Sequence, residues 1–189
     1  GAVSAFSATV DVGELDIDSL ALAQIDRATT RAAGGWQKFS YSLLRLQALR
    51  GPLSLYLSLN GQFALANLDS AEKFWLGGAN GVRAYPQGEA AGDDGYLANV
   101  ELRYRLEPWR GVQPQFVAFV DTGGVKLNHD PFAPGDAYRF LSGAGLGLNL
   151  AEAHGFALRA AWAWQLGPEA AQADKDRSGR GWILIGKTF

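Results

Sequence analysis

Apolar and polar residues alternate along most of this chain. Between residues 53 and 65 the odd positions are nearly all apolar, whereas the even positions are mostly polar. Such a period of two gives a β-strand one apolar and one polar face. Similar segments recur along the sequence and predict strands near residues 3–17, 35–49, 53–65, 95–107, 112–125, 138–151, 155–167 and 180–189.

These segments are longer than the about 5–6 residues of an average soluble strand. They suit the roughly 9–11 residues with which a tilted strand crosses a bilayer. The connections alternate between short ones (50–52, 108–111, 151–154) and long ones (18–34, 66–94, 126–137, 168–179). Short turns at one end and long loops at the other are typical of bacterial outer-membrane barrels. The predicted fold class is therefore all-β, an antiparallel transmembrane β-barrel with about eight strands in this chain.

The strand faces predict which side chains meet lipid and which line the barrel. Leu57, Val100 and Leu146 belong to the apolar faces, whereas Glu101, Arg103 and Arg159 belong to the polar faces and are expected on the lumen wall. Aromatic residues near strand ends are expected to form interfacial girdles: Trp36, Tyr96, Trp109, Tyr138, Phe156 and Trp182. A soluble β-barrel that binds a small ligand is an alternative, and it requires the leucine face of residues 53–65 to point inward.

Two further segments have local signals of other structures. Residues 18–33 contain a rough apolar stripe behind a possible N-cap at Asp18 or Ser19. We interpret this segment as a surface loop with marginal helicity. Gly143, Gly145 and Gly147 resemble the start of a dinucleotide fingerprint, but they lie within one strand, where that motif does not function. A glycine line on an inward face instead leaves room for close packing.

The composition excludes several classes of function. The net charge of −2 gives no basic surplus for nucleic-acid binding, so no nucleic-acid partner is expected. The chain has no cysteine, and His129 and His154 have no suitably spaced acidic partners, so no metal site is predicted. No nucleophile elbow or phosphate loop occurs, which gives an enzyme little support.

The long connection 66–94 is too rich in apolar residues and glycine to be read as disordered. It contains Leu76-Gly77-Gly78, then Val82-Arg83-Ala84-Tyr85, then Gly92-Asp93-Asp94-Gly95. Glu101-Leu102 follows on the next strand, and Phe119-Val120-Asp121-Thr122-Gly123 on the strand after that. In this order the motifs resemble those of the TpsB transporters, the haemolysin secretion/activation proteins of two-partner secretion, which belong to the BamA superfamily. Ala84 stands where the family tetrad usually has glycine.

The resemblance implies a barrel of sixteen strands, of which this chain (1–189) would be the C-terminal half. The segment 66–94 would be the family's lumen loop, and no segment resembles a POTRA domain. Phe189 matches the C-terminal signal used by the barrel-assembly machinery. The implied function is export of an unfolded TpsA-type exoprotein, an adhesin or haemolysin, across the bacterial outer membrane, with that membrane's lipid as surroundings and without any cofactor. A small closed barrel without transport activity is the alternative, because eight strands alone enclose no aqueous channel.

Asp121 is predicted to point into the lumen, where its carboxylate needs a cation or water. Water, Arg103 or Arg159 could satisfy it from the wall. The resemblance implies a different partner, Arg83, delivered by a lumen loop that folds back into the barrel. Phe119 and Gly123 lie on the same strand motif.

Overall fold

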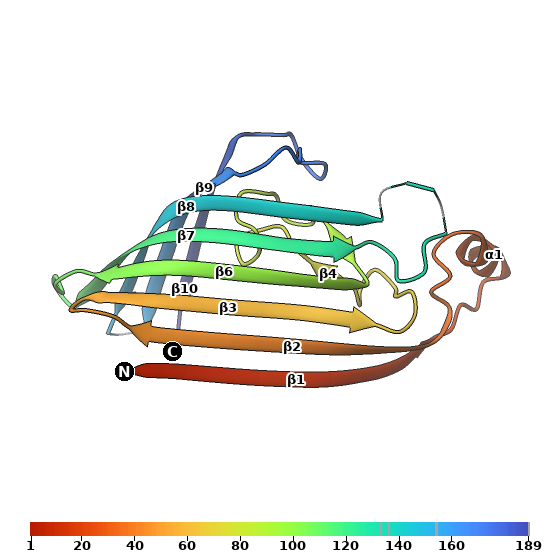
Figure 1. Cartoon of the computed structure of the whole chain (residues 1–189), viewed down its shortest axis with the longest axis horizontal. Coiled ribbons are helices and arrows are strands. Elements are labelled where there is room, and N and C mark those ends of the chain that lie inside the picture. Colours follow the sequence, from red (N-terminus) through yellow and green to blue (C-terminus); the bar gives the residue numbers. More distant parts are fainter. Residues whose placement is uncertain (133, 136, 154, 189) are drawn as a thin grey trace.

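The structure, a computed structural model, describes residues 1–132, 134–135, 137–153 and 155–188, so Phe189 and His154 lie outside the described residues. Its main feature is one antiparallel sheet with the strand order β1-β2-β3-β6-β7-β8-β9-β10 (Figure 1). Every predicted strand is present, with bounds close to those expected: β1 (Ala2–Leu15), β2 (Gly34–Ala48), β3 (Leu53–Ala64), β6 (Asp94–Arg105), β7 (Val112–Lys126), β8 (Tyr138–Glu152), β9 (Phe156–Gln165) and β10 (Gly179–Lys187).

The connections alternate as the sequence predicts. Residues 16–33, 65–93, 127–137 and 166–178 all leave the same end of the sheet, and the tight turns lie at the other end (Figure 1). In these turns Gly51 and Gly111 have φ angles of 58° and 80°. Glycine adopts this left-handed region without the steric cost that a Cβ brings.

The sheet curls but does not close. Within the described residues, β1 pairs only with β2 and β10 pairs only with β9. The alternative of a small closed barrel is therefore wrong for this chain. Each outer strand leaves one row of backbone donors and acceptors without strand partners, so each edge can pair with a further strand.

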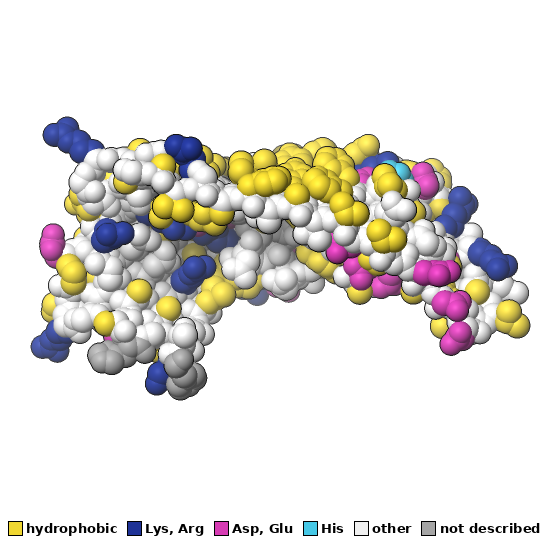
Figure 2. All heavy atoms as spheres, turned by 90° about the horizontal axis from the view of Figure 1, so that it is seen from below, with side chains coloured by type: hydrophobic (Ala, Val, Ile, Leu, Met, Phe, Trp, Pro, Cys, Tyr) yellow, Lys and Arg dark blue, Asp and Glu magenta, His cyan; other side chains and the backbone are white. Residues whose placement is uncertain are grey.

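The two faces of the sheet differ in polarity. Asp121 is paired with Asn99, and Asn99 with Ser58, so these three share one face, which we call the inward face. The opposite, outward face carries apolar side chains that are 43–59% exposed, among them Val100, Leu102, Phe116, Val120 and Leu146. Figure 2 shows a band of hydrophobic side chains along the top of the molecule, above a hollow underside.

The aromatic residues divide between both faces. Tyr96 and Tyr138 lie on the outward face near the end with the long connections, where Phe39, Tyr41 and Phe63 stack at centroid distances of 6.3 Å. Trp36 and Trp182 lie on the inward face instead, so their assignment to a girdle was wrong. Trp36 shares the face of Lys38, which reaches the segment 66–94, and Trp182 hydrogen-bonds to that same segment.

The segment 18–33 contains a genuine helix, α1 (Leu20–Ala28), which corrects its interpretation as a loop. Ser19 is the N-cap and accepts a hydrogen bond from the amide of Leu22. Burial by itself raises the pKa of Asp26. Hydrogen bonds from Thr30, Ala32 and Ala33 together lower the pKa by more than burial raises it, so the pKa lies below the ordinary value. These bonds fold the chain after the helix back onto it, a contact that a local apolar stripe does not reveal.

The segment 66–94, hereafter the lumen loop, lies against the inward face rather than projecting from the sheet. It contains a small sheet of its own, in which β4 (Phe74–Trp75) pairs with β5 (Ala91–Gly92). Leu76, Val82 and Tyr85 are fully buried and form the main hydrophobic core together with Phe119 and Leu141 of the sheet. The part of the chain that the structure describes has no helix long and apolar enough to cross a membrane.

Candidate functional site

The inner end of the lumen loop is a compact turn held by its own backbone. The amide of Val82 donates to the carbonyl of Leu76 at 2.7 Å, and that of Gly81 to Gly78 at 3.1 Å. A Cβ at Gly81 would lie 1.9 Å from the Leu76 carbonyl oxygen, so only glycine fits there. This turn directs the side chain of Arg83, the residue after Val82, toward the sheet.

Arg83 binds Asp121 through a planar, two-pronged contact. Its Nε donates to Oδ2 and its Nη2 to Oδ1, both at 2.8 Å, and its backbone amide adds a third bond to Oδ2 at 3.1 Å. The Asp121 side chain is fully buried and that of Arg83 is 13% exposed. Charge-assisted, bidentate pairs of this kind are the most directional contacts that arginine makes with a carboxylate.

Neighbouring side chains complete the surroundings of the guanidinium. Its Nη1 lies 2.8 Å from Oε1 of Glu101, and its plane stacks on Phe119 with 3.4 Å between Cζ and the ring centroid. Arg103 pairs with the other oxygen of Glu101 at 2.7 Å instead of contacting Asp121. Of the candidate cations, Arg83 is therefore the one that binds Asp121.

Arg159 stays at the margin of this group. It is exposed, and it lines a small cavity of about 50 Å³ together with Arg83, Glu101 and Arg103. The sequence placed it on the lumen wall, and the strand register puts it on the inward face opposite Asn149.

Two residues at the site were missed by the sequence analysis. Asn99 donates from Nδ2 to Asp121 at 2.8 Å and to the Gly81 carbonyl at 3.3 Å, and thus links the sheet to the turn. Trp182 donates from its indole nitrogen to the Arg83 carbonyl at 2.7 Å. Asn99 lies two residues before Glu101 on the same strand, so alternation puts both on the polar face. Nothing local indicates that Trp182 reaches residue 83, which is far away in sequence.

The glycines of β7 and β8 provide space for the loop. A Cβ at Gly143 would lie 2.6 Å from the Cβ of Ala84, and one at Gly123 would lie 2.6 Å from Leu76. Gly145 instead makes room for the Phe119 ring. The expected close packing against this glycine line is thus present at Gly143, where the lumen loop touches the wall.

The acidic pair at the end of the loop has a structural role. Asp93 is fully buried, with Oδ1 2.7 Å from Nζ of Lys73, and Oδ2 accepts the His129 amide at 2.8 Å. Asp94 accepts the amide of Ala64 at 2.8 Å and lies 3.2 Å from the His129 ring. These bonds hold the base of the lumen loop to the connection 127–137.

Comparisons with known proteins identify a family for the chain and solved structures with a similar fold. The family model of the haemolysin secretion/activation protein ShlB/FhaC/HecB matches residues 17–150. The heme/hemopexin transporter protein HuxB of Haemophilus influenzae is 30% identical over 154 residues, which are 80% of this chain. The chain covers only 27% of the length of that relative.

Two solved structures have similar folds. CdiB from Escherichia coli matches over 98% of this chain and 33% of its own, with a TM-score of 0.77 and 18% identity, a likeness of fold alone. CdiB from Acinetobacter baumannii matches over 80% of this chain and 28% of its own, with a TM-score of 0.59 and 27% identity. The family model covers well over half of the sequence, so this chain belongs to the ShlB/FhaC/HecB family of haemolysin secretion/activation proteins, β-barrels of the bacterial outer membrane.

Proposed function

We propose that this chain is the C-terminal half of a sixteen-stranded outer-membrane barrel that exports an unfolded partner exoprotein by two-partner secretion. The family supports this, since its relative HuxB is named a heme/hemopexin transporter. The open sheet supports it too, because β1 and β10 each have an unpaired edge that a further strand can extend. The partner would be a secreted TpsA-type adhesin or haemolysin, and the proposal assigns no covalent chemistry.

The remaining partners follow from the proposed location. The outward apolar face would contact outer-membrane lipid, and the barrel-assembly machinery would insert the chain with Phe189 as its signal. The long connections would be extracellular and the tight turns periplasmic, as in bacterial barrels generally.

One observation carries the proposal: the lumen loop is fixed to the inward face by the pair of Arg83 and Asp121. A loop inside the barrel blocks the path that an unfolded chain would take. Desolvation offsets much of the attraction in a buried ion pair, so the pair fixes the position of the loop more than it stabilises the fold. We propose that export requires this position to be defined in the resting barrel and given up during passage.

The structure predicts an asymmetry between the two partners. Arg83→Ala leaves the buried Asp121 carboxylate with Asn99, and an uncompensated buried charge costs roughly 3–5 kcal/mol. Asp121→Ala leaves Arg83 with Glu101 and Phe119 and should disturb the loop less. The double variant should be no worse than Arg83→Ala, because the two residues share one interaction.

The measurement is secretion of the partner by the full-length protein, combined with protease sensitivity of the lumen loop. Arg159→Ala is the matched control, because Arg159 lies on the same wall and is exposed. Secretion at the wild-type level by Arg83→Ala, or an equal loss in Arg159→Ala, would contradict the proposed role.

A further inference from the structure

A second carboxylate of the lumen loop, besides that of Asp93, is fully buried. Glu89 has a fully buried side chain, and its Oε1 lies 2.8 Å from Nη2 of Arg139 on β8. Arg139 also donates to the Glu89 carbonyl at 3.3 Å. This contact alone would be an ordinary ion pair between the loop and the wall.

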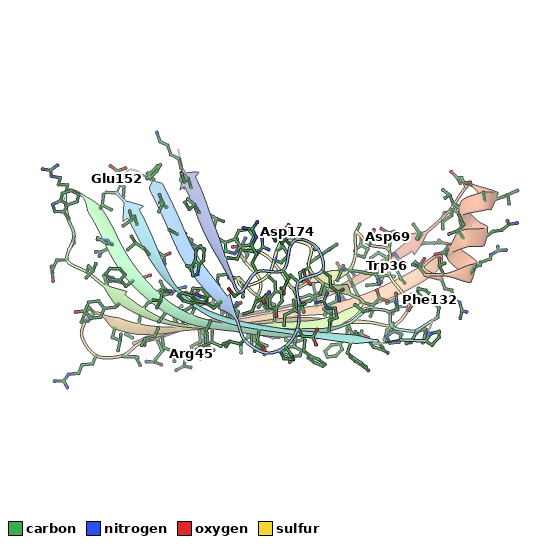
Figure 3. The ribbon with its side chains drawn as sticks, turned by 90° about the horizontal axis from the view of Figure 1, so that it is seen from above. Trp36, Arg45, Asp69, Phe132, Glu152 and Asp174 are labelled. Carbon is green, nitrogen blue, oxygen red and sulfur yellow. The ribbon has the colours of Figure 1, made fainter. Side chains whose placement is uncertain are left out.

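The other partners of Glu89 belong to the connection between β9 and β10. Its carboxylate accepts the amides of Gln172 at 2.9 and 3.0 Å and of Ala173 at 3.0 Å. Two consecutive amides aimed at one carboxylate form a small anion-binding concavity. Figure 3 shows this connection, which carries Asp174, on the concave side of the sheet. We call residues 166–178 the cap segment.

Further bonds tie the cap segment to the same two elements. Arg139 donates from Nη2 to the carbonyl of Ala170 at 3.0 Å, and the Tyr85 hydroxyl donates to the carbonyl of Glu169 at 2.8 Å. The cap segment is also organised internally, because Asp176 accepts the amide of Ala171 at 2.9 Å. It therefore presents a preformed backbone surface to Glu89.

We propose that Glu89 is a positioning residue that joins the cap segment to the lumen loop, so that the two close the exit of the barrel as one plug. The cap segment is exposed over most of its length, and its Ala171 packs against the hydrophobic core. Bonds to Glu89, Arg139 and Tyr85 hold it over the lumen loop. Its Asp174 and Asp176 accept bonds from Arg180 of β10 and Gln165 of β9, which hold its ends to the sheet. This inference rests on the proposed transport function, since it adds a second moving part to the same plug.

The chemistry of the site requires a carboxylate rather than a side chain of similar shape. Three donors converge on Glu89, namely the Arg139 guanidinium and the amides of residues 172 and 173. In Glu89→Gln one oxygen becomes an NH₂ group, which is itself a donor and opposes one of them. The variant keeps the volume of the side chain but removes its negative charge and one of its two acceptor oxygens.

The first test is hydrogen exchange by mass spectrometry on the full-length protein in nanodiscs. In Glu89→Gln the amides of the cap segment should exchange roughly tenfold faster, which corresponds to about 1.4 kcal/mol of local opening free energy. The control is Glu72→Gln, because Glu72 is also in the lumen loop but pairs with Lys38 at 2.8 Å. Unchanged exchange in the cap segment, or equal acceleration in both variants, would overturn the proposal.

A charge reversal distinguishes a link from Glu89 to the cap segment from a simple ion pair between Glu89 and Arg139. Glu89→Arg combined with Arg139→Glu would restore an ion pair but would direct a guanidinium at the amides of Gln172 and Ala173. The proposal predicts that exchange stays fast in this double variant, and recovery to the wild-type rate would overturn it.

Channel recordings of Glu89→Gln and Glu72→Gln test whether the link between Glu89 and the cap segment helps to keep the barrel closed. Glu89→Gln should open several times more often than wild type and Glu72→Gln should not; equal opening rates would overturn the role in closure. Both comparisons set a variant against a wild-type barrel that conducts. A wild-type barrel that neither conducts nor secretes would refute the proposed function, whatever the role of Glu89.

Discussion

Ala84 and Gly143 share a space that holds only one methyl group. Ala84 is 1% exposed, and among the described non-glycine residues only Arg31 and Arg110 have positive φ. The backbone at residue 84 therefore does not require the family's usual glycine. What the site requires is a missing side chain on the wall opposite, and Gly143 provides it.

This complementarity predicts a reciprocal rescue. Gly143→Ala should push the lumen loop away from the wall, because the new methyl would overlap that of Ala84, and overpacking costs about 1–3 kcal/mol. Adding Ala84→Gly should restore loop protection in hydrogen exchange, since one methyl then again fills the space. Failure of the double variant to recover would show that residue 143 acts through something other than this contact.

At the level of the elements, strand register decides which environment each side chain meets. Leu59 lies between Leu43 and Ala98 on the outward face, whereas its neighbour Ser58 lies beside Asn99 on the inward face. Arg45 is also on the outward face, where it pairs with Leu57. Figure 3 shows Arg45 toward the end with the tight turns, whereas Trp36 and Asp69 lie toward the other end. Leu59 is therefore a better probe of the lipid face than Leu57.

Arginine substitutions at these adjacent positions should differ in effect. Leu59→Arg should weaken folding into bilayers by roughly 2–4 kcal/mol, the cost of arginine at a lipid-facing site near the midplane. Ser58→Arg should cost much less, because its side chain enters the polar lumen. Urea titration of folding into lipid vesicles measures both, and similar losses would contradict the assigned faces.

The whole molecule is an arch with two free edges rather than a tube. In Figure 1, β1 forms one margin of the curved sheet, while β9 and β10 turn behind it. The hollow of the arch is occupied by the lumen loop and the cap segment (Figure 3). A wide pore therefore depends on strands that this chain does not supply.

The chain on its own should show little steady conductance after reconstitution in planar bilayers. Its eight strands do not close here, and even a closed eight-stranded barrel has an interior just wide enough for side chains. Openings that grow with protein concentration would indicate that two copies complete a barrel. Large, stable openings from a verified monomer would be inconsistent with the open sheet.

The sequence by itself determined the strands and their connections, because a period of two is a local property that each strand carries within itself. It also indicated the inward faces of Asn99, Glu101 and Asp121, since their neighbours alternate clearly. The pairing of Arg83 with Asp121 was expected only through the family resemblance, and local patterns left Arg103 and Arg159 as equal candidates.

Only the tertiary structure decided the contacts between segments that are distant in sequence. The faces of β10 are apolar on both sides, with Trp182 and Leu184 on one and Ile183 and Ile185 on the other, so alternation could not place Trp182. The bonds around Asp26 and Glu89 depend on where later segments fold back. Whether the sheet closes depends on its accumulated curvature and on the availability of further strands, which no single segment of the sequence encodes.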